Sequence, residues 1–102
     1  MNNVYAIAKF KLKDIALKNE WKILSDKITE DIKANAKGFI FRDVLVDDAG
    51  NVQCILKWES REDQEAFKKV MDERFKNEPE LMEQMAKFAD MSTMSKEVLE
   101  VL

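Results

Sequence analysis

The chain of 102 residues contains no histidine and one cysteine, Cys54. The missing imidazole removes the commonest general base and the commonest metal ligand. One cysteine excludes an internal disulfide and is typical of a reducing compartment, so we expect a cytoplasmic location. A metal would have only carboxylates to bind it, and the acidic clusters have the pattern of turns and helix starts. We therefore expect no metal site.

Glycine, proline and long apolar runs are equally scarce. Two glycines and one proline exclude a collagen-like or linker-rich chain, and 46% hydrophobic residues argue against disorder. No apolar run approaches the roughly 20 residues that a membrane span needs. The start, Met1-Asn2-Asn3-Val4, has no basic segment before a long apolar core, so we expect no secretory signal. Residues 1–102 are predicted to form a single domain.

The charged residues form no block of one sign. There are 17 basic and 20 acidic residues, for a net charge of −3, and the lysines are interspersed with acids. An acidic total without a basic stripe argues against nucleic acid or an anionic membrane as a partner.

The hydrophobic period predicts a strand and then a helix in the first third of the chain. Residues 4–12 alternate apolar and polar positions, as a strand does. Residues 14–35 instead carry apolar side chains at helical spacing, with Asp14 as N-cap and Gly38 as a stop. This apolar stripe consists of Leu17, Trp21, Leu24, Ile28 and Ile32.

The remaining segments repeat the pattern. Residues 39–46 and 52–59 are predicted strands joined by a polar hairpin loop at 47–51. Ser60 is positioned to cap a following helix, and Pro79 to open a second one. Residues 96–102 are predicted to form the closing strand. This order predicts a ferredoxin-like α+β fold, a four-stranded antiparallel sheet with helices on one face.

Both faces of this sheet should carry apolar side chains. The first is predicted to hold Ala6, Ala8, Phe10, Cys54, Leu56 and Trp58, and the second Tyr5, Ile7, Ile40, Val44, Val46 and Ile55. Helices on one side cover only one face, and a large exposed apolar patch usually marks an interface. We therefore expect a homodimer with sheet packed on sheet. The alternative is that the edge strands splay and leave the second face partly exposed.

Two short motifs resemble the antibiotic biosynthesis monooxygenase-like family. They are the run Lys57-Trp58-Glu59-Ser60-Arg61-Glu62 and the run Ala36-Lys37-Gly38-Phe39, set in the same element order and size. The resemblance implies a dimeric α+β barrel with a cavity between sheet and helices. Some members oxidise small aromatic or quinol-type molecules with molecular oxygen and no cofactor, and others have no known reaction. Haem degradation, known in one branch, is not expected because that chemistry needs a histidine.

We predict that a small apolar or aromatic ligand would contact five residues: Trp58, Phe67, Met71, Arg74 and Met85. Trp58 matches the strand-end tryptophan that lines the cavity in several relatives, and its ring offers a flat stacking surface. Arg74 could hold a phenolate or carboxylate. The spacing of the methionine and phenylalanine residues also fits simple core packing, and the Arg74 head could lie in solvent.

Three other residues are weaker candidates. Arg42 is expected to face solvent or a partner subunit, and Tyr5 to lie opposite Trp58 on the partner side. Cys54 is expected to be a buried small hydrophobe because no histidine is available to activate it. The sequence thus predicts a cofactor-independent monooxygenase or, alternatively, a non-catalytic ligand-binding or structural dimer.

Overall fold

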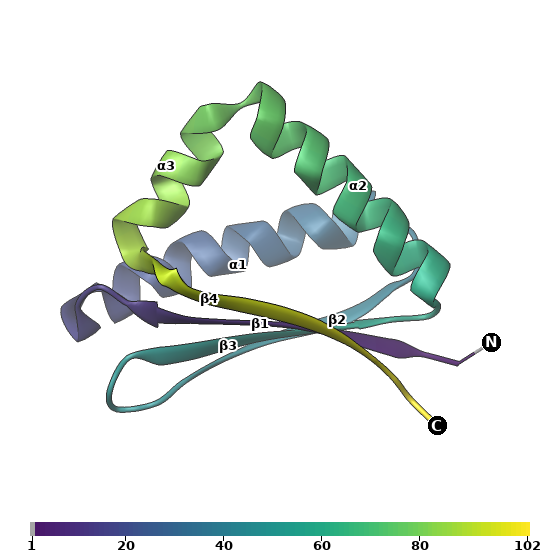
Figure 1. The fold of residues 1–102 in the computed structure, drawn as a ribbon, viewed down its shortest axis with the longest axis horizontal. Coiled ribbons are helices and arrows are strands. Elements are labelled where there is room, and N and C mark those ends of the chain that lie inside the picture. Colours follow the sequence, from purple (N-terminus) through teal and green to yellow (C-terminus); the bar gives the residue numbers. More distant parts are fainter. Residues whose placement is uncertain (1) are drawn as a thin grey trace.

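The computed structural model describes residues 2–102. Its elements are β1 (Val4–Leu12), a 3₁₀ turn (Ile15–Leu17), α1 (Lys18–Asn35), β2 (Phe39–Val46), β3 (Asn51–Trp58), α2 (Arg61–Asn77), α3 (Pro79–Phe88) and β4 (Ala89–Glu100). The strands form one antiparallel sheet in the order β2-β3-β1-β4. The helices lie on one side of it (Figure 1). The predicted ferredoxin-like α+β fold is therefore confirmed.

Capping side chains fix where α2 and the 3₁₀ turn before α1 begin. The Ser60 hydroxyl accepts a hydrogen bond from the Asp63 amide at 3.1 Å and donates to the Asp63 carboxylate at 3.0 Å, which fixes the start of α2. Asp14 also acts as an N-cap and accepts from the Ala16 amide at 2.9 Å. The turn that Asp14 caps is 3₁₀, so the long helix begins at Lys18 and not directly after Asp14.

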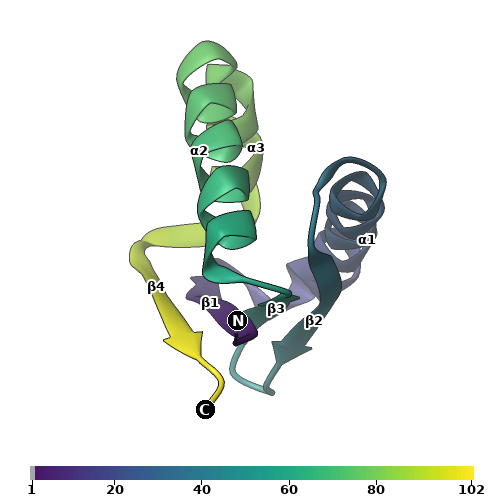
Figure 2. The same ribbon diagram turned by 90° about the vertical axis from the view of Figure 1, so that its right-hand side faces the viewer.

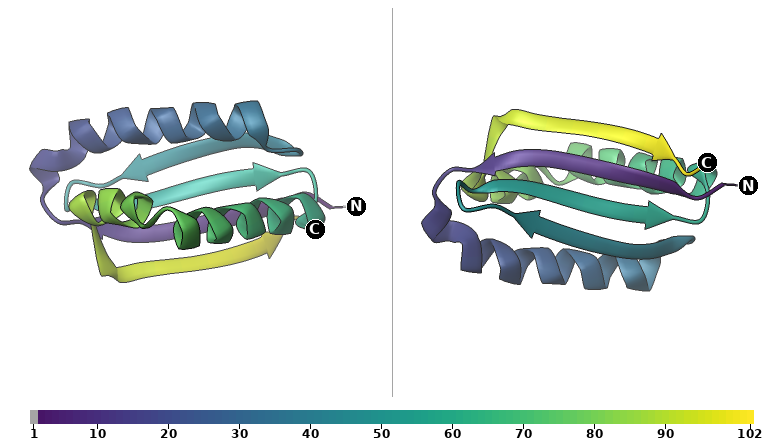
Figure 3. Two further views of the ribbon diagram at one scale, coloured as in Figure 1. Left: turned by 90° about the horizontal axis from the view of Figure 1, so that it is seen from above. Right: turned by 90° about the horizontal axis from the view of Figure 1, so that it is seen from below.

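Two clusters of buried side chains fill the space between sheet and helices. The larger one comprises Phe10, Leu12, Trp21, Val52, Cys54 and Ala89. The smaller one comprises Val4, Ile32 and Trp58. Leu56 packs against both. Each cluster contains a residue of α1, Trp21 in the larger and Ile32 in the smaller, so the clusters lie at opposite ends of the sheet. Helix α1 runs along the β2 side of the sheet, while α2 and α3 rise over β1 (Figures 2 and 3).

The predicted faces of β2 are wrong because this strand contains an irregularity. Phe39 pairs with Trp58 and Phe41 with the adjacent Lys57, so Ile40 is an extra residue in β2. Such a bulge reverses which side chains face the helices beyond it. Val44 and Val46 therefore pack in the larger cluster, and Ile40 is 41% exposed.

The uncovered face of the sheet carries apolar side chains, as predicted, but with different members, and Asp43, Gln53 and Lys57 lie among them. Tyr5, Ile7 and Ile55 lie on it as expected, and the bulge adds Phe41 and Leu45. The Tyr5 and Phe41 rings make an edge contact with centroids 6.1 Å apart. Leu45 is 51% exposed, and no helix of the described chain covers this side (Figure 1).

The last strand is longer than predicted and begins at Ala89 instead of Lys96. Its register with β1 shifts, because Lys9 pairs with Ser95 whereas Lys11 pairs with Asp90. At the shift, the Thr93 hydroxyl accepts from the Lys11 amide at 2.8 Å in place of a strand carbonyl. The polar residues of this irregular stretch have the composition of a loop, which conceals the strand in the sequence.

None of the helices formed by residues 2–102 is long and apolar enough to span a bilayer.

Candidate functional site

Trp58 is the centre of an aromatic group at the end of β3. Its ring centroid lies 4.9 Å from that of Phe67 on α2 and 5.7 Å from that of Phe39 on β2. Its side chain is fully buried. Because Ser60 starts α2 just after β3, the first turns of this helix carry Phe67 back over the tryptophan. The two predicted site residues Trp58 and Phe67 are thus brought together.

The indole N–H of Trp58 has no hydrogen-bond partner within the described residues, and the same holds for Trp21. Buried N–H groups are nearly always paired, since an unpaired one costs about 1–3 kcal/mol. In the Trp58 group, this leaves one fully buried polar atom without a partner.

Arg74 lies on α2 but its charge is already compensated. Its Nη1 is 3.3 Å from an Asp31 carboxylate oxygen on α1, and its Nε is 3.5 Å from a Glu78 carboxylate oxygen. The side chain is 39% exposed. Arg74 therefore links α1 to the end of α2, and an anionic ligand would compete with two acids for it.

The two methionines do not join Trp58 in one group. Met85 packs against the larger cluster, which contains Trp21. Met71 is half-buried on α2. The five predicted contact residues are therefore dispersed. Trp58 lies in the smaller cluster with Phe67 packed against it and Met85 packs against the larger one, whereas Met71 belongs to neither and Arg74 is held in ion pairs.

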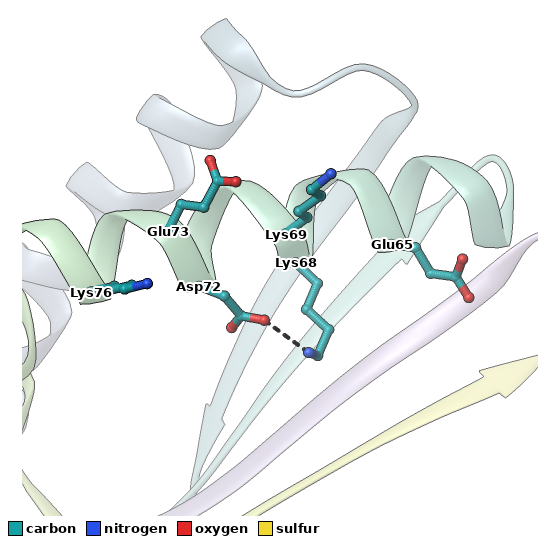
Figure 4. A pocket seen from close by; sticks show the side chains of 6 residues that line it. All are labelled: Glu65, Lys68, Lys69, Asp72, Glu73 and Lys76. Carbon is teal, nitrogen blue, oxygen red and sulfur yellow. Dashed lines mark hydrogen bonds and ion pairs between the residues drawn. The ribbon is translucent and has the colours of Figure 1, made fainter.

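The best-defined hollows in the described structure lie away from these five residues. One is on the outward side of α2 and is lined by Glu65, Lys68, Lys69, Asp72, Glu73 and Lys76 (Figure 4). It contains the Lys68–Asp72 ion pair at 2.9 Å. The other is lined by Asn2, Val4, Ser60, Arg61, Glu62 and Glu100. Long charged side chains make up the whole lining of the first hollow and half of the lining of the second, as expected for solvated surface.

Arg42 is the residue that the sequence placed wrongly. The bulge in β2 turns it toward α1, where Nη1 donates to the Ser25 carbonyl at 3.0 Å, to the Ser25 hydroxyl at 2.7 Å and to the Thr29 hydroxyl at 2.9 Å. It is half-buried and does not face solvent or a partner. Only the bulge determines this position, and no local sequence signal announces it.

Cys54 lies beside Arg42, with its sulfur 3.7 Å from Nη2. Burial raises the pKa of the Cys54 thiol, and the nearby guanidinium only partly offsets this effect. The thiol is therefore held in its protonated, weakly nucleophilic form, as predicted for a buried small hydrophobe. Residues 2–102 also contain no group of three or more potential metal ligands.

The structure defines a ferredoxin-like α+β chain, and its fold is shared by solved structures over nearly their full lengths. A conserved protein from Methanosarcina mazei Go1 aligns with a TM-score of 0.67 and 13% identity, covering 97% of this chain and 92% of that one. Rv0793 from Mycobacterium tuberculosis aligns with a TM-score of 0.65 and 18% identity, covering 98% and 95%.

A third structure bears on the family that the sequence motifs resemble. A proposed antibiotic biosynthesis monooxygenase from Bacillus cereus aligns with a TM-score of 0.56 and 20% identity, covering 99% of this chain and 94% of that one. The chain therefore has the fold of a protein assigned to that family. The sequence itself matches no protein-family model and no curated protein.

Proposed function

We propose that this chain is a cofactor-independent monooxygenase that acts on a small aromatic or quinol-type molecule. The observation that carries the proposal is the aromatic group around Trp58, with an indole N–H that no described residue satisfies. A planar ligand would stack against such rings and accept the free hydrogen bond with a carbonyl or phenol oxygen. The fold shared with the Bacillus cereus protein supports the same class of reaction.

In the proposed reaction the substrate supplies the electrons. Deprotonation makes an anthrone or quinol electron-rich enough to react with O₂. For an anthrone, the ring methylene loses two hydrogens and gains one oxygen atom, and the second oxygen leaves as water. The protein contributes a dry site that orients the ring and stabilises the anion. In this proposal Phe67 and Trp58 contact the ring of the ligand, and Met71, Met85 and Arg74 are the further contacts that the sequence predicts.

The second candidate is a ligand-binding protein without catalysis. It is favoured by the lack of a base: the chain has no histidine, the Cys54 thiol is held protonated, and Arg74 is paired with two acids. In its most conservative form, methionine and phenylalanine side chains fill the space and the protein is a structural dimer.

We propose that either activity belongs to a homodimer. Tyr5, Ile7, Phe41, Leu45 and Ile55 form an apolar face that no helix of the described chain covers. Leaving large apolar side chains in water forgoes about 1.5–3 kcal/mol each. Two copies packed sheet to sheet would bury this face and leave the helix side of each subunit free to hold a ligand.

Oxygen uptake with a panel of anthrones and naphthoquinols tests the enzyme proposal. We expect turnover by the wild-type chain, a loss of turnover in Trp58→Phe, and little change in Trp21→Phe. Trp21 is the matched control because it is also a buried tryptophan with an unpaired N–H, but lies in the other cluster. Retention of a co-purified ligand in native mass spectrometry, without oxygen uptake, would favour the second candidate.

A further inference from the structure

Arg42 has only neutral hydrogen-bond partners among the described residues, whereas Lys22, Lys33, Lys68 and Arg74 each form an ion pair with a carboxylate. The Nη1 of Arg42 contacts Ser25 and Thr29 on α1, and its Nη2 contacts the Cys54 sulfur. Within residues 2–102, no carboxylate lies at ion-pair distance from it. Half-buried charges are normally paired or fully solvated, since removing a charge from water is costly. The guanidinium of Arg42 is therefore an uncompensated positive charge on the helix-covered side of the sheet.

The local geometry leaves part of this guanidinium available. The three bonds of Nη1 use neutral oxygens of α1 and fix the orientation of the planar group. Nη2 has only a sulfur atom at 3.7 Å, which is a weak acceptor. An oxygen anion on that side would gain a charge-assisted hydrogen bond that the thiol cannot provide.

The position of Arg42 connects it to the residues of the proposed site. It pairs across the strands with Leu56, and Leu56 packs against both the Trp58 cluster and the cluster that Met85 contacts. Arg74, by contrast, is engaged by Asp31 and Glu78. Of the two arginines, Arg42 is the one whose charge a ligand would neutralise without displacing an acid.

We propose that Arg42 is the anion-binding residue of the ligand site, and that the ligand is an aromatic molecule bearing a carboxylate or phenolate. This inference rests on the proposed function, because it assumes that a ligand enters between sheet and helices. It assigns to Arg42, and not to Arg74, the role of selecting an anionic ligand.

A matched pair of probes distinguishes the contribution of the ligand's negative charge to affinity from that of its aromatic ring. The probes are 2-naphthoate and 2-naphthamide, which share one aromatic body and differ in charge, titrated into the wild-type protein by ¹H–¹⁵N NMR. We expect naphthoate to bind about tenfold more tightly than naphthamide, the effect of one hydrogen bond to a charged group. We also expect the Arg42 Nε–H signal to shift with naphthoate and not with naphthamide.

Charge-altering variants then identify which arginine contacts the anionic probe. Arg42→Gln should abolish the preference for naphthoate while leaving naphthamide affinity unchanged, and Arg42→Lys should retain most of the preference. Arg74→Gln should also retain it, because Asp31 and Glu78 already engage that guanidinium. Arg61→Gln, at the exposed first residue of α2, is the control and should retain all of the preference. Arg42→Gln could fail to fold because Arg42 also fixes α1 to the sheet. In that case the proposal is tested by the ratio of the wild-type affinities for the two probes and by the shift of the Arg42 Nε–H signal.

Each outcome is decisive. Equal affinity for the two probes, or a preference lost in Arg74→Gln and kept in Arg42→Gln, overturns the role of Arg42 and leaves the ligand site standing. Failure of both probes to bind between sheet and helices overturns the ligand site and the role of Arg42 together.

Discussion

The rings of Trp58 and Phe67 lie 4.9 Å apart, centroid to centroid, at an interplanar angle of 35°. This contact joins the end of β3 to the second turn of α2, which the chain reaches within nine residues. It holds α2 at the point where it leaves the sheet, so the same pair supports the fold and forms the centre of the candidate site. Substitutions at Trp58 must therefore be judged on stability and on ligand binding separately.

Trp58→Phe and Trp21→Phe should destabilise the protein by similar amounts. Each removes three buried ring atoms, worth about 2 kcal/mol, and each also removes an unpaired N–H. Urea denaturation gives the free energy of unfolding of both variants. Ligand affinity should fall only in Trp58→Phe. Equal losses of affinity in the two variants would show that the effect comes from stability alone.

Gly38→Ala should be more damaging than Gly50→Ala. Both glycines have positive φ, at +78° and +86°, a conformation that costs other residues about 1–2 kcal/mol. A Cβ at Gly38 would also overlap the Asp63 carboxylate, whereas at Gly50 the nearest atom is 3.6 Å away. Displacing Asp63 disturbs the Ser60 cap, which adds about 1 kcal/mol to the loss at Gly38. Thermal unfolding of both variants measures the difference, and equal melting temperatures would contradict it.

Leu45→Asp should convert the expected dimer to a monomer. Leu45 is 51% exposed on the uncovered sheet face, and a buried, unpaired aspartate in a sheet-to-sheet contact is strongly unfavourable. Ile23→Asp is the control, because Ile23 is 61% exposed but lies on α1. Size-exclusion chromatography with light scattering at micromolar concentration reads out the mass. A monomeric wild-type protein, or a monomeric Ile23→Asp variant, would count against the assigned interface.

Asp47→Asn should destabilise the hairpin at neutral pH but not in acid. The Asn51 side chain, followed by the backbone amides of the turn, lowers the pKa of the Asp47 carboxyl. A carboxyl whose pKa is lower when folded stabilises the fold above its unfolded pKa of about 3.9 and loses that contribution as pH falls through the folded value. The melting temperatures of wild type and Asp47→Asn should therefore converge as the pH falls below about 4.

The neighbouring Asp48→Asn provides the comparison for that experiment. The Asp47 carboxylate accepts from the amides of Ala49 and Asn51, both at 2.9 Å, and those bonds are what the pH change removes. Differential scanning calorimetry from pH 6 to pH 2 should show the convergence for Asp47→Asn alone. A difference that persists unchanged to pH 2 would argue that the charge has no role.

The sequence predicts the regular elements well because their signals are local. The alternation in β1, the helical stripe through Trp21 and Ile32, and the caps at Asp14 and Ser60 each depend on residues a few positions apart. The strands at 4–12 and 39–46 have the predicted bounds. The start of β4 was missed because its polar residues pair with β1 only through tertiary contacts.

The candidate site was predicted less completely, for a physical reason that concerns β2. A strict period of two places Arg42 on the uncovered face, and only pairing with β3 reveals the extra residue at Ile40. The contact of Trp58 with Phe67 could be predicted from the motif at the end of β3 and the start of α2 at Ser60. The engagement of Arg74 by Asp31 was not, because these residues are brought together by the packing of α1 against α2.

The bulge at Ile40 thus determines which side chains of the edge strand β2 face the helices and which face the uncovered side. If Ile40 paired with β3 in regular alternation, Val44, Val46 and Arg42 would face the bare side and Leu45 and Asp43 would face the helices. Deleting Ile40 would instead remove the bulge and leave these side chains on their present faces. Whether the cation Arg42 or the anion Asp43 lies under the helices at this edge therefore depends on the bulge at Ile40, and not on the residue types alone.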